Sequence, residues 1–131
     1  MRGLPASWYL DPDRAPLEDS AIFAPSWQFV GHVSDLPAPG TAVRFDCGGR
    51  SAVVLRTKAG GLQGFRNVCR HRGARLVEGD VHTGLAFCID GRLRCPYHGW
   101  TYDEAGVLVS IPAGQHFEEF DADAHSLHPL H

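Results

Sequence analysis

Short runs of apolar and β-branched residues, separated by glycine and proline, run through the first half of the chain. The runs at 27–33, 41–46, 51–56 and 62–67 each fit one strand. Turn residues separate them, such as Gly48-Gly49 and Gly60-Gly61. The pattern predicts a meander of antiparallel strands.

The second half repeats this pattern with shorter strands. Candidate strands are 85–88 and 93–94, joined by Asp90-Gly91, and 101–102 with 107–110, joined by residues 103–106. Residues 17–23 could form a short helix before Pro25, so the segment before the first strand is expected to be an arm. Beyond Pro112 the chain turns polar and irregular, which is typical of a linker.

Composition supports one small all-β domain. The chain has 131 residues, 44% of them hydrophobic, with 15 Gly and 9 Pro, which favours turns over a helical bundle. A net charge of -3 with no basic run gives no sign of nucleic-acid binding, and no apolar run is long enough to cross a membrane. The first ten residues lack the apolar core of a secretory signal, so we expect a cytoplasmic protein.

Four cysteines and eight histidines carry the candidate chemistry. Two cysteines are each followed closely by a histidine, in Cys69-Arg70-His71 and in Cys95-Pro96-Tyr97-His98. Two such loops could hold a tetrahedral zinc ion or a Rieske 2Fe-2S cluster, in which two cysteines bind one iron and two histidines the other. A zinc site usually has two to four residues between paired ligands, and Cys69 and His71 have one between them, so the spacing favours the cluster. Without a metal, the four would be ordinary buried cysteines and hydrogen-bonded histidines.

The sequence around these residues resembles a known family. The segments NVCRHRGARLVEGD (67–80), RCPYHGWTYDEAGVL (94–108) and SWQFVGHVSDLPAPG (26–40) resemble the N-terminal part of the α subunit of Rieske-type ring-hydroxylating oxygenases. The resemblance runs from about residue 9 to residue 128. It implies that Cys69 and Cys95 bind one iron of a 2Fe-2S cluster and that His71 and His98 bind the outer iron.

The resemblance also implies a fold and its division. We expect a Rieske-type antiparallel β-sandwich at 26–115, with an inserted cluster-binding subdomain at about 67–102. Residues 1–25 would form a short helical N-terminal arm, and residues 116–131 a linker-like tail toward a catalytic domain. Gly73 and Gly99 follow the ligand histidines, where the backbone would turn closely around inorganic sulfide.

The chain departs from the family at one point. Here 23 residues separate His71 from Cys95, more than is usual in the family, and Cys88 follows His71 after only 16. No histidine follows Cys88 closely, so we retain Cys95 as the ligand and interpret residues 81–93 as an extended hairpin. Cys88 and Cys47 are expected to be ordinary strand cysteines.

Respiratory Rieske proteins have a disulfide between the cluster loops and a serine hydroxyl bonded to a cluster sulfide. The matching positions here are Ala74, Tyr97 and Trp100, and none supplies either feature. Fewer hydrogen bonds to sulfur predict a reduction potential at the low end of the Rieske range, which suits oxygen activation.

The expected function is electron transfer. In the resembled subunits a mononuclear Fe(II), held by two histidines and a carboxylate, oxidises the substrate in a separate domain. The tail residues His116, His125, His128 and His131 do not match that motif, so we expect no catalysis by this chain alone and infer no substrate.

The expected partners follow from that function. They are a reductase or ferredoxin donor and an oxygenase catalytic domain or subunit; an oligomer is possible. Arg70 and Arg72 either attract an acidic donor or are simply solvated surface residues. The alternatives are a self-standing Rieske ferredoxin and a redox-sensing assembly module.

Overall fold

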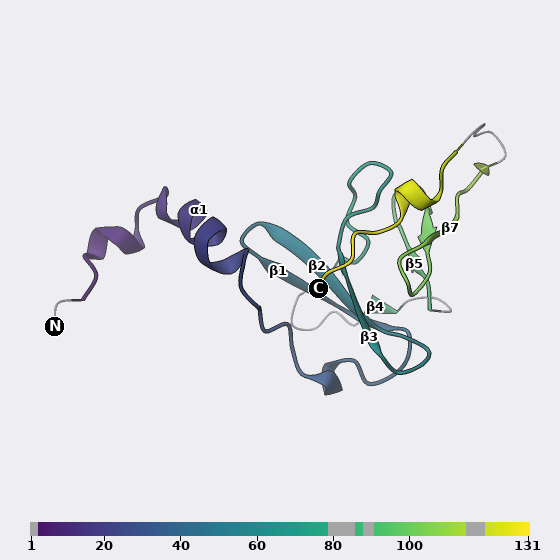
Figure 1. Ribbon diagram of the computed structural model, residues 1–131, viewed down its shortest axis with the longest axis horizontal. Helices are drawn as coiled ribbons and strands as arrows, with labels where there is room; N and C mark the ends of the chain where they lie inside the picture. Colours follow the sequence, from purple (N-terminus) through teal and green to yellow (C-terminus); the bar gives the residue numbers. More distant parts are fainter. Residues whose placement is uncertain (1–2, 79–85, 88–90, 115–119) are drawn as a thin grey trace.

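A computed structural model describes residues 3–78, 86–87, 91–114 and 120–131, and it shows two antiparallel sheets with a helical arm extending from them (Figure 1). The larger sheet has the order β3-β2-β1-β4 and the smaller one the order β5-β6-β7. This confirms the prediction of an all-β fold. The strands are β1 (Thr41–Cys47), β2 (Arg50–Arg56), β3 (Leu62–Arg66), β4 (Ala86–Phe87), β5 (Leu93–Arg94), β6 (Thr101–Tyr102) and β7 (Leu108–Ser110).

The core lies between the sheets and under the two cysteine loops. Val53 and Leu55 alternate along β2 with less buried neighbours, as expected for a strand with one face on the core. Val53 pairs with Phe65 on β3, and both are almost fully buried. Tyr102 of β6 joins the same cluster of buried residues, so the smaller sheet shares its core with the larger one.

The predicted strand at 27–33 is wrong. Residues 27–32 are irregular, and Trp27 and Phe29 are 90% and 83% exposed. The chain turns immediately afterwards into the 3-10 helix Val33–Asp35, where the Asp35 carboxylate accepts the His32 backbone N–H at 2.7 Å. The apolar run thus forms an extended segment with exposed aromatic side chains.

The arm consists of the 3-10 helix Ala6–Tyr9, helix α1 (Arg14–Glu18) and the π-helical turn Asp19–Phe23. It is tied to the β1–β2 turn by Asp19, whose two carboxylate oxygens each lie 2.7 Å from Arg50 Nη1. The sequence predicts a short helix at residues 17–23, and α1 and the π-helical turn lie in this part of the arm. None of the described helices is long and apolar enough to cross a membrane.

Part of the segment expected to be a linker-like tail is integrated into the fold. Leu127 is buried, and its N–H donates to the Gly106 carbonyl at 2.8 Å. Leu130 donates to Gly64, and His128 accepts from Arg66, so this end of the chain runs beside β3. The domain boundaries proposed from the sequence stay predictions.

A short electrostatic network supports the β1–β2 hairpin. Arg44 Nε donates to both carboxylate oxygens of Asp46 at 3.0 and 3.1 Å, and the Ser51 hydroxyl donates to the same carboxylate. The hydrogen bond from Arg44 is the main cause that lowers the pKa of Asp46 to about 2. The ionised carboxylate therefore stabilises the folded hairpin.

We expect Asp46→Asn to lower the free energy of unfolding by about 1–2 kcal/mol at pH 7, less than the whole shift implies because the Asp46 side chain is 30% exposed. The pKa is lowered on folding, so this stabilisation is present above the ordinary value of 3.8 and is lost as the pH falls toward 2. Denaturant unfolding of both proteins between pH 7 and 2 measures it. A difference in stability that does not change with pH would contradict this explanation.

Candidate metal centre

The first cysteine loop is closed by its own backbone. The Cys69 N–H donates to the Ala74 carbonyl at 2.7 Å, and the Gly73 N–H donates to the Cys69 carbonyl at 3.0 Å. Gly73 has φ +74°, a conformation that residues with a Cβ rarely adopt. The chain therefore makes a tight turn between Cys69 and Ala74.

The second loop has the same hydrogen bonds at the same positions. The Cys95 N–H donates to Trp100 at 2.8 Å, and the Gly99 N–H donates to Cys95 at 3.0 Å, with Gly99 at φ +73°. In both loops the closing glycine lies four residues after the cysteine; only the histidine differs, at the second position in one loop and the third in the other. The unequal motifs therefore occupy one common loop shape.

Asn67 fixes the first loop to the larger sheet. Its side chain is fully buried, and its Oδ1 accepts the N–H groups of Leu76 and Val77 at 3.0 and 2.9 Å. Its Nδ2 donates to the Val77 carbonyl at 2.8 Å and to the Ser51 hydroxyl on β2 at 3.1 Å. A buried amide with this many partners holds both ends of the loop in place.

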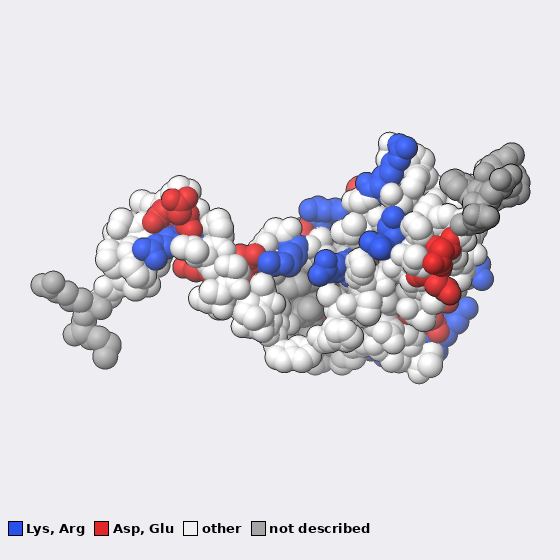
Figure 2. Space-filling view, turned by 45° about the horizontal axis from the view of Figure 1, so that its top comes forward, with Lys and Arg blue, Asp and Glu red and all other residues white. Residues whose placement is uncertain are grey.

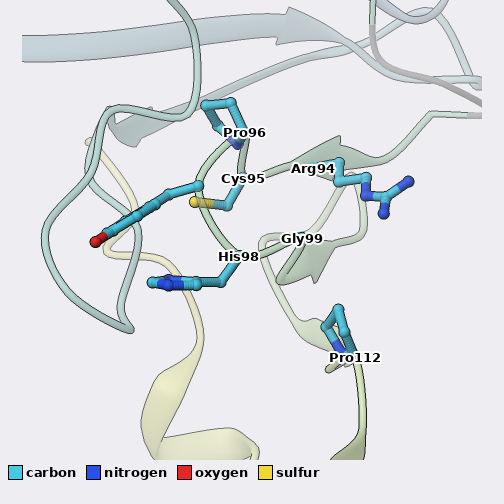
Figure 3. A pocket seen from close by; sticks show the side chains of 7 residues that line it. Arg94, Cys95, Pro96, His98, Gly99 and Pro112 are labelled. Carbon is cyan, nitrogen blue, oxygen red and sulfur yellow. The ribbon is translucent and has the colours of Figure 1, made fainter.

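The four predicted residues lie together as two pairs. Cys69 and Cys95 are each 2% exposed and both are free thiols. Burial and the neighbouring Cys95 thiol raise the pKa of Cys69. The rings of His71 and His98 have centroids 4.8 Å apart, and His98 is exposed. In Figure 3 the Cys95 sulfur and the His98 ring point to the same side of the loop, away from Arg94 and Pro112. The sulfur pair is thus the inner pair, and the imidazole pair the outer one.

These donors fit a two-iron cluster. Nδ1 of His71 is buried and has no hydrogen-bond partner among the described residues, a costly state that a metal ion would relieve. Burial lowers the pKa of His71, which favours the neutral imidazole that metals bind. Within the described part of the chain no three His, Cys, Asp or Glu side chains converge as ligands of a single ion, as tetrahedral zinc would require.

Tyr102 is a functional candidate that the sequence analysis missed. It is fully buried, and its hydroxyl lies 3.3 Å from Cys69 Sγ. The Arg70 N–H donates to the same hydroxyl oxygen at 3.0 Å, which leaves the hydroxyl proton free to be donated to sulfur. Burial raises the pKa of Tyr102 well above its usual range, so the hydroxyl keeps its proton. No spacing rule pointed to this residue, because the contact crosses between the two loops.

The other cysteines have different surroundings. Cys47 is half-buried at the end of β1, with its sulfur 3.9 Å from Gln28 Oε1. The predicted hairpin between strands 85–88 and 93–94 is wrong, because β4 pairs with β1 in the larger sheet and β5 pairs with β6 in the smaller one. Cys88 lies outside the described residues. The choice of Cys95 over Cys88 is therefore carried by the loop geometry of Cys95 alone.

Two matched loops at the end of a β-fold, each contributing one sulfur and one imidazole, define an iron–sulfur electron carrier of the Rieske type. The chain matches the family described as Rieske [2Fe-2S] domain over residues 26–121. It belongs to this family, and its cofactor is a 2Fe-2S cluster.

Sequence relatives are oxygenase subunits. The chain is 40% identical over 131 residues to the glycine betaine monooxygenase oxygenase subunit of Chromohalobacter salexigens, covering 97% of this chain and 27% of that protein. It is 39% identical over 104 residues to the benzene 1,2-dioxygenase subunit alpha of Pseudomonas putida, covering 79% and 22%. The chain thus spans about a quarter of the length of these relatives.

Solved structures agree. The quaternary ammonium Rieske monooxygenase CntA in its apo form has a TM-score of 0.82 and 35% identity, covering 98% of this chain and 36% of that one. Naphthalene 1,2-dioxygenase from Rhodococcus sp. has a TM-score of 0.77 and 33% identity, covering 91% and 26%. The fold and the family are therefore those of a Rieske oxygenase domain.

We expect Tyr102→Phe to lower the reduction potential of the cluster. A hydrogen bond donated to sulfur favours the form with the extra electron, and a net bond of about 1 kcal/mol corresponds to roughly 40 mV for one electron. Protein-film voltammetry measures the shift. A reduction potential that stays the same or rises would show that the hydroxyl does not donate to Cys69. Phe65→Leu is the control, because it disturbs the packing of the core without removing this hydrogen bond.

Proposed function

We propose that Cys69 and Cys95 bind one iron of the cluster and that His71 and His98 bind the outer iron. The support is the inner pair of thiols, the outer pair of imidazoles and the unpaired Nδ1 of His71. When bound, the cluster accepts and releases one electron at a time.

We propose further that the chain is the electron-transfer domain of a Rieske ring-hydroxylating oxygenase. The observation that carries this is the asymmetry of the site, because the thiols are buried while the His98 ring is exposed. An electron from a reductase or ferredoxin would enter at this exposed histidine edge. It would then pass to a mononuclear non-haem iron outside these 131 residues, in a catalytic domain or subunit.

A basic residue beside the histidines favours an acidic donor. Figure 2 shows Lys and Arg side chains distributed over the visible face of the body, with both acidic and basic side chains on the arm and toward the opposite end. Arg70 donates to the Ala124 carbonyl at 3.3 Å and so faces the tail, whereas Arg72 is exposed. Arg72 is therefore the better candidate to attract the donor.

The proposal includes a cytoplasmic location. Its support is Cys47, a described cysteine that is free and not assigned to the cluster, as a reducing compartment favours.

Reduction of the purified chain by a ferredoxin or reductase in air tests the proposed role. We expect two irons and two sulfides per chain, reversible bleaching of the visible spectrum, and no hydroxylated product from an added arene or quaternary amine. Adding an oxygenase fragment that holds the mononuclear iron should reoxidise the cluster faster than oxygen alone. Equal rates would instead favour a self-standing ferredoxin, and a colourless protein with one zinc would exclude both roles.

A pair of cysteine variants tests the ligand assignment. We expect Cys95→Ser to abolish the cluster, because it removes one of two buried sulfur ligands. Cys88→Ser is the matched control and should keep the visible spectrum and the electron paramagnetic resonance signal. The opposite result would place the second ligand at Cys88.

A further inference from the structure

The His71 ring lies flat against the indole of Trp100. The ring centroids are 4.7 Å apart and the planes differ by only 8°, so the two rings are stacked. Trp100 is 4% exposed, which makes it a fixed surface for the imidazole. The final side-chain torsion of histidine is intrinsically broad, and in metal sites the ring is usually oriented by a hydrogen bond from its other nitrogen. No hydrogen bond from a described residue orients the His71 ring, so its ring contacts do, namely the stack on Trp100 and the edge contact with His98.

The tail holds Trp100 in turn. Phe120 and His125 meet the indole edge-on, with centroids 5.5 and 5.6 Å away, and they pack against each other at 4.5 Å. His125 is itself fixed, because its Nδ1 lies 2.8 Å from the Asp121 carbonyl oxygen. A carbonyl only accepts, so Nδ1 carries the proton and donates it. Phe120 and His125 of the tail therefore pack against Trp100 in addition to the His71 ring.

The second histidine has no comparable support. His98 packs against Tyr97, with ring centroids 3.7 Å apart and planes tilted by 34°. Tyr97 is 62% exposed and comes from the same loop, directly before His98 in the sequence. The two outer imidazoles thus differ. His71 stacks on the buried Trp100, which packs against the tail, whereas His98 packs on the exposed Tyr97.

We propose that Trp100 is a positioning residue for His71, and that Phe120 and His125 keep the indole in place. The inference rests on the proposed ligand role of His71. Stacking fixes the rotation of the imidazole so that Nδ1 points to the site, while the orientation of His98 depends on its loop and on whatever covers it. The tail then supports the ring orientation of His71 and not that of His98.

Pulsed electron paramagnetic resonance of the reduced, cluster-loaded chain tests this, because it resolves the nitrogen couplings of the two histidines separately. In Trp100→Leu we expect one set of couplings to broaden or shift and the other to stay unchanged. Trp100→Phe retains a flat ring and should restore most of the native signal. Phe65→Leu also removes buried aromatic surface, from a side chain for which the described residues show no ring contact with either histidine, and it should leave both sets unchanged.

The outcomes separate the inference from the function on which it rests. A native chain without two sets of nitrogen couplings would refute the ligand assignment itself. A native signal that Trp100→Leu leaves intact, or that Phe65→Leu changes equally, would overturn the role of Trp100. If Trp100→Leu does not retain a cluster, His125→Leu decides: broadening of one set supports the role of the tail, and unchanged couplings overturn it.

Discussion

The approach of two buried thiols from separate loops is the constraint on which the rest of the domain depends. Cys69 and Cys95 are far apart in the sequence, yet both are buried in the same core cluster and Cys95 is near enough to affect the pKa of Cys69. Backbone closure of each loop at a glycine supplies the shape, and Asn67 and strand β6 supply the placement. The sheets mainly serve to place the Cys69 loop and the Cys95 loop, which have the same backbone hydrogen bonds, next to each other.

Much of this could be predicted from the sequence, because it depends on local chemistry. The pairs Cys69/His71 and Cys95/His98 carry metal-binding side chains at short spacing, and the glycines beside them mark the turns. Hairpins such as β1–β2 follow from alternating residues around Gly48-Gly49. In each case the signal and the structure that it predicts lie within a few residues of one another.

What could not be predicted depends on distant partners. The run at 27–33 alternates like a strand, but its aromatic side chains stay exposed in an irregular segment. Tyr102 looked like an ordinary strand residue, and its role is visible only because its hydroxyl crosses to Cys69. His125 was interpreted as a linker residue, although it packs on Trp100. A single sequence records no pairing across such separations.

Residues 100–102 contribute both to the stability of the domain and to the candidate metal site. Trp100 and Tyr102 are two residues apart around the start of β6; one stacks on His71 and the other bonds to Cys69, so both reach from the second loop to the first. Because both side chains are buried in the close-packed core, the loops cannot separate without breaking the packing that stabilises the domain. These contacts hold Cys69 and His71 in place, whereas His98 packs on the exposed Tyr97. A site that changes little in geometry when its charge changes suits one-electron transfer. The aromatic contacts that complete the core therefore also limit the motion of Cys69 and His71.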